Sequence, residues 1–216
     1  MNYSIDRMTP GDWYEVRAIY FEGIATGYAT FETDPGSWEK WDAAHLQDHR
    51  FVARRGSLGT GSAIGNSSIG NSSDSDSSGS GPAIGNSSTR GFSASDSSIR
   101  DSSDNRSSIL GWAALSPVSN RPVYAGVVEV SVYVTAKSQG QGIGRALLEA
   151  LIASVEKSSI WTLQAAIFPE NRASLALHLR CEFREVGRRE KLGKLYGKWR
   201  DVLLLERRSK VVGIGD

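Results

Sequence analysis

The fold of this chain is decided by Gln139-Gly140-Gln141-Gly142-Ile143-Gly144. This stretch follows an apolar run over residues 127–134 and opens an amphipathic segment over residues 145–152, an order that predicts strand, glycine turn and helix. Because glycine has no Cβ, successive backbone N–H groups can turn toward one point. The start of a helix adds unpaired donors and the positive end of its dipole. Together these features predict a cradle for an anion, most often a phosphate.

Composition excludes several classes of protein. The chain has 216 residues and a net charge of +1, which gives no electrostatic reason to expect nucleic acid or a membrane surface as a partner. The N-terminal residues lack the apolar core of a signal peptide, and no apolar run approaches the roughly 20 residues of a membrane span. Cys181 is the only cysteine, so no intrachain disulfide can form. A cytoplasmic protein is therefore expected.

Residues 57–108 differ from the rest of the sequence. Glycine, serine, asparagine and aspartate dominate them, and Ile64-Gly65-Asn66-Ser67-Ser68 recurs at 69–73 and 84–88. Such a composition cannot bury enough apolar surface to offset the entropy of ordering the chain. We expect one domain over residues 1–216, interrupted by a disordered low-complexity insertion.

The remaining sequence predicts a mixed α/β sheet with one phosphate-type turn after its central strand. Thr9-Pro10 and Asp34-Pro35 each indicate a helix start, because proline suits the first helical position and the residue before it can cap the helix. The strands on either side of the insertion resemble a hairpin whose turn has been expanded. Strands are expected at 3–7, 51–54, 109–115, 127–134, 162–167, 183–192 and 199–206, and helices at 9–22, 34–48, 145–157 and 171–180.

Three interpretations of the glycine turn compete. A dinucleotide fold needs the glycines after the first strand and an acidic residue at a later strand end, whereas here the turn follows the fourth strand and Glu156 is helical. A nucleoside-triphosphate loop needs Gly-Lys-Ser/Thr, which Gly144-Arg145-Ala146 does not supply. The third interpretation is a turn that only packs a helix on a sheet.

Further stretches favour a ligand. The Gln139-x-x-Gly142-x-Gly144 spacing resembles the signature of the GNAT superfamily of acyl-CoA-dependent N-acetyltransferases. The chain is most similar to the branch that acetylates phosphinothricin and methionine sulfoximine. The stretches that resemble this branch are Ala29-Thr30-Phe31-Glu32-Thr33, Arg121-Pro122-Val123-Tyr124, Glu129-Val130-Ser131-Val132-Tyr133-Val134, Pro169-Glu170-Asn171-x-x-Ser174-x-x-Leu177-His178 and Gly197-Lys198-Trp199-Arg200-Asp201-Val202.

The resemblance implies a fold and a reaction. The fold is the GNAT type, a central twisted mixed sheet flanked by helices. The reaction is acetyl transfer from acetyl-CoA, as co-substrate and without a metal, to the amine of a small amino-acid-like acceptor. A homodimer is expected from the family alone. Two alternatives stay open: a non-catalytic acyl-CoA sensor, and a GNAT enzyme for another amine such as a polyamine, an aminoglycoside or a protein N-terminus.

Glu129 is the candidate general base. It is the one acid in an otherwise apolar strand, and alternation puts it on a face with Val127, Ser131 and Tyr133. An α-amino group has a pKa of about 7.7–8.0, so a base within reach would help to produce the neutral amine that attacks the thioester. The resemblance gives this glutamate the same role. The alternative is an acid at a strand edge that points to solvent.

His178 is the second catalytic candidate. Asn171, Ser174 and His178 share one face of their predicted helix. Relatives often have a tyrosine here that protonates the departing thiolate, and the phosphinothricin branch has histidine, which can give or take a proton near neutrality. The alternative is a packing histidine. We interpret His45 and His49 as solvent-facing residues of the second helix.

Contacts to the co-substrate follow from geometry and resemblance together. The central strand should present backbone groups to the pantetheine arm as an added strand would, and one of its N–H groups could stabilise the oxyanion. The glycine turn should bind the pyrophosphate. The candidate cofactor-binding residues are Val132, Tyr133, Val134, Gln139, Gly140, Gln141, Gly142, Ile143, Gly144, Arg145, Asn171 and Ser174.

The acceptor is expected to contact Glu129 and three further residues. Arg121 suits a carboxylate or phosphinate because its guanidinium forms a fork of donors, although it could equally be a solvated turn residue. Tyr124 matches the same branch, and Phe31 would form a wall of the pocket. Trp199 and Asp201 are interpreted as core or dimer-facing and Cys181 as a poor nucleophile.

One departure from the family concerns Glu182. Relatives have glycine before the aromatic residue that starts the sixth strand, which here is Phe183. If this position needs a positive φ, glutamate costs about 1 kcal/mol.

Overall fold

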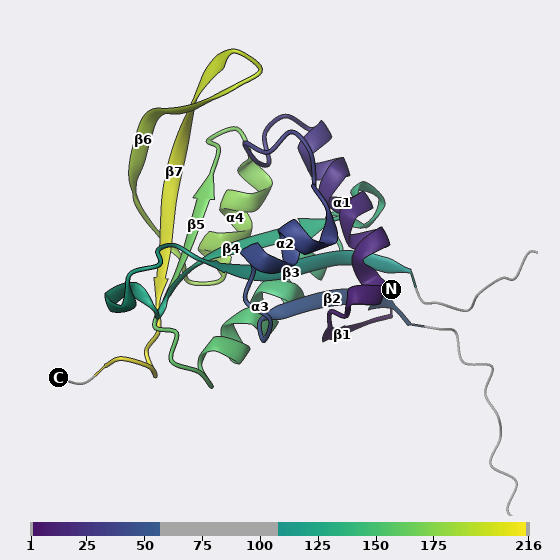
Figure 1. Ribbon diagram of the computed structural model, residues 1–216, viewed down its shortest axis with the longest axis horizontal. Coiled ribbons are helices and arrows are strands. Elements are labelled where there is room, and N and C mark those ends of the chain that lie inside the picture. Colours follow the sequence, from purple (N-terminus) through teal and green to yellow (C-terminus); the bar gives the residue numbers. More distant parts are fainter. Residues whose placement is uncertain (1, 57–107, 215–216) are drawn as a thin grey trace, which may run out of the picture. The chain divides into compact units, whose positions relative to one another are not determined.

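The computed structural model describes residues 2–56 and 108–214, and within them one seven-stranded sheet has the order β1-β2-β3-β4-β5-β7-β6 (Figure 1). The predicted insertion at 57–108 lies, apart from residue 108, outside the described residues. Every neighbouring pair of strands is antiparallel except β4 and β5, which are parallel. The strands are β1 (Tyr3–Arg7), β2 (Arg50–Arg55), β3 (Ile109–Pro117), β4 (Val127–Val134), β5 (Thr162–Ile167), β6 (Arg184–Leu195) and β7 (Lys198–Arg208).

Helices cover both faces of the sheet. On one face, α1 (Trp13–Ala25) and α2 (Trp38–Ala44) bury an aromatic cluster centred on Trp41 and Trp112. On the other, α3 (Ile143–Val155) and α4 (Arg172–Arg180) cover an aliphatic core to which β3, β4 and β5 all contribute. Alternation along β3 separates these two layers, since Trp112 and Ala114 face the first and Ala113 and Leu115 the second.

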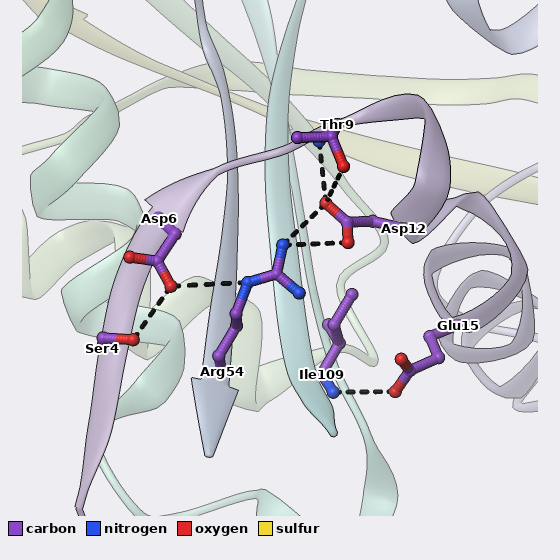
Figure 2. Close-up of polar contacts among 7 residues, drawn as sticks. All are labelled: Ser4, Asp6, Thr9, Asp12, Glu15, Arg54 and Ile109. Atoms are coloured by element: carbon purple, nitrogen blue, oxygen red, sulfur yellow. Dashed lines mark hydrogen bonds and ion pairs between the residues drawn. The ribbon is translucent and has the colours of Figure 1, made fainter. Parts of the chain in front are cut away.

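A partly buried ionic network anchors the strand ends that lead toward the insertion (Figure 2). The Arg54 guanidinium on β2 bonds both carboxylate oxygens of Asp12 at 2.8 and 2.9 Å and lies 3.4 Å from the Asp6 carboxylate of β1. The Ile109 N–H at the start of β3 donates to Glu15 of α1 at 2.8 Å. Both ends of the expanded hairpin are therefore tied to β1 and α1, which fits an antiparallel β2–β3 pair that tolerates a long connection.

The first helical segment starts at Pro10 as predicted, with Thr9 at its N-cap. A short 3₁₀ turn over Pro10–Asp12 precedes α1, and Thr9 and Asp12 form a capping box. The Asp12 carboxylate accepts from both the N–H and the hydroxyl of Thr9, at 2.7 and 3.0 Å. A carboxylate in the first turn satisfies the free donors of the helix end and also suits the helix dipole.

The second helix is shorter than predicted. The start signal at Asp34-Pro35 was wrong, because the Asp34 side chain instead accepts from the Gly36 N–H in a tight turn at 2.6 Å. Ser37 caps α2, accepting from the Lys40 N–H, and the helix ends at Ala44 rather than near residue 48. His45, the residue that follows the helix, has an extended conformation, and a turn over residues 47 and 48 leads into β2.

The interpretation of His45 and His49 as solvent-facing was also wrong. His45 stacks on Trp41 with ring centroids 4.1 Å apart, and its Nδ1 lies 2.7 Å from the Trp41 carbonyl oxygen. His49 is 7% exposed, and its Nδ1 lies 2.8 Å from Ser154 Oγ on α3. Both imidazoles, which the local sequence pattern predicts to be on the surface, thus pack against other parts of the fold: His45 against Trp41 and His49 against α3.

None of the helices in the described part of the chain is long and apolar enough to cross a membrane.

Glu182 stands where the resembling family has glycine. Its φ of +66° lies in the left-handed region, so the glutamate backbone is strained there. Its side chain forms exposed ion pairs with Lys210 at 3.2 Å and Arg207 at 3.8 Å, which contribute little in water. We therefore expect Glu182→Gly to be about 1 kcal/mol more stable than Glu182→Ala, since both remove the ion pairs and only glycine relieves the strain. Urea unfolding of the two variants checks this, and equal midpoints would contradict it.

Candidate functional site

The ladder between β4 and β5 ends early. Its register runs from Val127 opposite Thr162 to Glu129 opposite Gln164 and goes no further, although both strands continue. Beyond this point β4 still pairs with β3, and β5 still pairs with β7. The two central strands therefore part at Glu129, and among the described residues one backbone edge of the rest of β4 has no partner strand.

Alternation along β4 identifies the groups on this free edge. The Thr135 N–H donates to Leu110 on β3 at 2.9 Å, and the Tyr133 carbonyl lies against Gly111 of the same strand. Because backbone polar groups point alternately to the two edges of a strand, Val132 and Val134 present theirs toward the gap. Of the three predicted pantetheine contacts, Val132 and Val134 thus offer backbone donors and acceptors there, and Tyr133 does not.

The glycine turn stands where the free edge of β4 ends. Gly140 and Gly142 have φ of +73° and +81°, and Gly142 is the residue immediately before α3. The first hydrogen bond of the helix runs from Ala146 N–H to the Gly142 carbonyl at 3.0 Å, so the N–H groups of Ile143, Gly144 and Arg145 have no acceptor within the helix. The turn thus has the free donors and dipole end that favour an anion.

Close packing fixes this turn against its neighbours. A Cβ on Gly144 would lie 3.3 Å from Leu177 of α4 and 3.5 Å from Val134 of β4, so the start of α3 meets both elements there. On the other side, the Glu22 carboxylate of α1 accepts from Ala136 N–H at 2.9 Å, just before the turn. The Arg145 side chain points away to an exposed ion pair with Glu149 at 2.7 Å. Its backbone, rather than its charge, belongs to the cradle.

Glu129 lies at the point where β4 and β5 part. Its register opposite Ser116 puts it on the face of α1 and α2, together with Ser131 and Tyr133 as alternation predicts. The side chain of Glu129 remains accessible to solvent. Partial desolvation by neighbouring groups nevertheless raises the pKa of Glu129, and the positive charge of Arg189 opposes this shift. A carboxylate with a raised pKa that water can still reach suits proton abstraction.

His178 is buried rather than open to the site, with 3% exposure and its ring edge against Phe183 at 5.0 Å. Nδ1 lies 2.8 Å from the Ser174 carbonyl oxygen, which can only accept, so Nδ1 carries the proton. Burial lowers the pKa of His178, which this bond to Ser174 partly opposes. The neutral ring therefore has no proton on Nε2, whose nitrogen is buried without a partner among the described residues.

Asn171 and Ser174 organise the start of α4. The Asn171 side chain accepts from Ser174 N–H at 3.1 Å and so caps the helix. The Ser174 hydroxyl lies 3.4 Å from Nδ1 of His178, one turn along. The predicted face of Asn171, Ser174 and His178 thus exists, and it is linked by hydrogen bonds.

The predicted acceptor residues lie in two groups. The Arg121 guanidinium lies over the ring of Tyr124 at 5.4 Å, in the 3₁₀ turn over Pro122–Tyr124 that leads into β4. Phe31 packs edge-on against Phe168, at the end of β5, with ring centroids 4.7 Å apart. Cys181 is buried at the end of α4, and burial raises the pKa of its thiol, which disfavours the thiolate that a nucleophile needs.

Two residues near the site were missed by sequence reasoning. Arg189 of β6 lies close enough to Glu129 to oppose its pKa shift, and Gly193 of β6 packs against the Phe31 ring. Arg189 stands in a run of charged residues that reads as a solvated strand, and no local signal separates it from its neighbours. Gly193, a glycine inside a strand, does indicate a close approach or a bulge.

Known proteins with similar sequences include several N-acetyltransferases. Residues 90–183 match the model of the Acetyltransferase (GNAT) family. A phosphinothricin N-acetyltransferase from Streptomyces coelicolor is 38% identical over 99 residues, which are 46% of this chain and 58% of that protein. An L-methionine sulfoximine/L-methionine sulfone acetyltransferase from Pseudomonas paraeruginosa is 34% identical over 98 residues, 45% of this chain and 57% of that protein. The aligned stretches thus span little more than half of these relatives.

The fold is shared over a longer stretch. The structure of a GNAT superfamily phosphinothricin acetyltransferase from Sinorhizobium meliloti in complex with AcCoA matches with a TM-score of 0.69 at 20% identity, covering 100% of this chain and 93% of that chain. The chain therefore has the predicted GNAT-type fold, and the predicted resemblance to phosphinothricin and methionine sulfoximine acetyltransferases is confirmed.

Burial lowers the pKa of His45, His49 and His178, so the folded chain binds fewer protons than the unfolded chain just below the ordinary histidine pKa of about 6.5. Stability should fall as the pH drops below about 6.5, by up to about 1.4 kcal/mol per pH unit for each histidine that stays neutral. We expect His49→Asn to reduce this slope. Urea unfolding between pH 5.5 and 7.5 measures it, and an unchanged slope in the variant would refute the assignment to His49.

Proposed function

We propose that this chain is an acetyl-CoA-dependent N-acetyltransferase whose acceptor is the α-amine of a small amino-acid analogue of the phosphinothricin or methionine sulfoximine type. One observation carries the proposal: β4 and β5 part at Glu129, and the edge of β4 that this leaves without a partner leads to a glycine turn whose N–H groups at the start of α3 have no acceptor within the helix. The activities for which the relatives are named support the proposed reaction and the acceptor class. We also propose that the protein is cytoplasmic and forms a homodimer. Sedimentation velocity is the direct test of the homodimer.

The residues present fit coenzyme A at both ends of the gap. The N–H groups of Gly144 and its neighbours are placed for a pyrophosphate, where a positive φ and the helix dipole converge. The edge of β4 at Val132 and Val134 offers backbone groups to the amides of the pantetheine arm, in the manner of an added strand. A bound acetyl-CoA supplies the thioester, which would then lie beside the part of β4 that contains Glu129.

Glu129 would remove the proton of the acceptor ammonium, directly or through one water. The shift brings the pKa of the Glu129 carboxyl group closer to the pKa of the amine. Because the side chain is exposed, the substrate or a water molecule can reach it. Arg121 over Tyr124 provides a cation for the acceptor carboxylate. His178 enters as a residue that orders α4 and the Asn171 turn, since its neutral ring has no proton to give to a departing thiolate.

We expect Glu129→Gln to lower kcat/KM for the amine by about 10²-fold or more, because an amide cannot accept the proton. In the parent chain kcat/KM should fall as the pH drops through the raised pKa of Glu129, and the variant should lose this limb. Thiol release with L-phosphinothricin or L-methionine sulfoximine measures both. Full turnover by the variant across pH 6–9 would show that another group is the base, and no turnover by the parent would favour the acyl-CoA sensor.

Gly142→Ala tests the anion cradle. The new methyl group has space, since only the Tyr3 hydroxyl comes as near as 3.9 Å, so the change acts through φ of +81° alone. We expect about 1 kcal/mol of lost stability and about a fivefold weaker affinity for coenzyme A.

Gly36→Ala is the matched control for this prediction. Gly36 also has a positive φ, +77°, and lies in the loop before α2. This variant should lose similar stability and keep its affinity for coenzyme A. Calorimetric titration compares the two, and an equal loss of affinity in both variants would count against the cradle.

A further inference from the structure

The β6–β7 hairpin contains a large β-bulge in β6. Arg189 pairs with Val202, and the next pair is Gly193 with Arg200, so three residues of β6 face the single residue Asp201 of β7. Lys191, in the middle of the bulge, has φ of +49°, a conformation that lysine adopts only when its surroundings fix it. A bulge of this kind bends its strand and redirects the side chains on either side.

Asp201 fixes the bulge through both of its carboxylate oxygens. Oδ1 accepts from the Lys191 N–H at 2.8 Å, and Oδ2 accepts from Arg188 Nε at 2.9 Å. These bonds lower the pKa of Asp201 below its usual range, and the bond from the Lys191 backbone makes the largest contribution. The side chain thus stays ionised and binds the strained residue and the strand before it.

Both residues that flank the bulge face the proposed acceptor site. Arg189, just before it, is the cation that opposes the pKa shift of Glu129. Gly193, just after it, lies so close to Phe31 that a Cβ there would be 2.8 Å from the ring. Phe31 in turn packs on Phe168, so the position of the hairpin determines how far the Phe31 wall can move.

We propose that Asp201 is a positioning residue for acceptor recognition: by fixing the bulge it presses Gly193 against Phe31 and so limits the side-chain size of the amino-acid acceptor. This deepens the proposed function and rests on it. Asp201 itself touches no reacting atom, since its carboxylate is taken up by Lys191 and Arg188. Its effect on acceptor binding passes through the backbone of β6.

Asp201→Ala and Asp201→Asn separate this role from general stability. The alanine variant loses both bonds, and we expect the KM for L-methionine sulfoximine to rise about fivefold, with kcat and the KM for acetyl-CoA within about twofold of the parent. Discrimination against a bulkier acceptor such as L-phenylalanine should also weaken. The asparagine variant keeps an oxygen for the Lys191 N–H and should recover most of the acceptor KM.

Glu206→Ala is the matched control, because it removes another ion pair across the same hairpin, Arg184 to Glu206 at 2.7 Å, which lies away from the Lys191 bulge and beside a separate register shift between Glu185 and Gly187. It should leave both KM values unchanged. If Asp201→Ala gives the acceptor KM of the parent, or if both KM values rise together in Asp201→Ala and in Glu206→Ala, the positioning role is refuted.

Amide hydrogen exchange tests the inference without relying on turnover. The Lys191 N–H should exchange at least about tenfold faster in Asp201→Ala than in the parent or in Glu206→Ala, because it loses its acceptor. Unchanged exchange at Lys191 would overturn the inference even if the enzyme is active. Faster exchange in a chain that acetylates no amino acid would instead reject the proposed function and leave the structural role of Asp201 standing.

Discussion

The early end of the ladder between β4 and β5 is the constraint on which the rest of the site depends. A strand pair in the middle of a sheet normally satisfies its backbone groups along its whole length, because unpaired buried groups are costly. Here the ladder stops at Glu129, while β3 and β7 keep the outer edges of the two strands fixed. The backbone of Val132 and Val134 is left facing a gap, which a ligand with amide groups can satisfy.

The local parts of this arrangement could be predicted from sequence. Strand β4 has the predicted bounds, and the glycine turn follows from residue types over a few positions, with α3 beginning two residues before the predicted start at 145. The positive φ at Glu182 was expected only through the resemblance, because relatives have glycine there. The parting of β4 and β5 could not be predicted, because both segments have the pattern of ordinary strands. Which residues of a strand lack a partner depends on how distant strands bend, and no local pattern records it.

The wrong expectations have the same physical origin. Proline after Asp34 is a sound helix signal, but the Asp34 side chain satisfies a turn instead and the helix waits for Ser37. His45 lies in a polar-looking stretch, yet stacking on Trp41 recovers its apolar area. In both cases a specific contact, from Asp34 to the Gly36 N–H or from His45 to Trp41, outweighs helix propensity. Helix propensity amounts to only a few tenths of a kcal/mol per residue.

The two halves of the proposed site differ in how they are built. The half that would bind the acetyl donor is nearly continuous in sequence, from Glu129 through Gly144, so its elements and their order are fixed by neighbours along the chain. The half that would bind the acceptor is discontinuous in sequence: the tertiary fold brings Phe31 against Gly193 of the β6–β7 hairpin, while Arg121 and Tyr124 form a separate group. Substitutions in the hairpin can therefore change the amine that is accepted while the donor half stays intact. This difference explains why the local sequence predicts an anion-binding turn, whereas the acetyl donor and the acceptor are both identified only through resemblance.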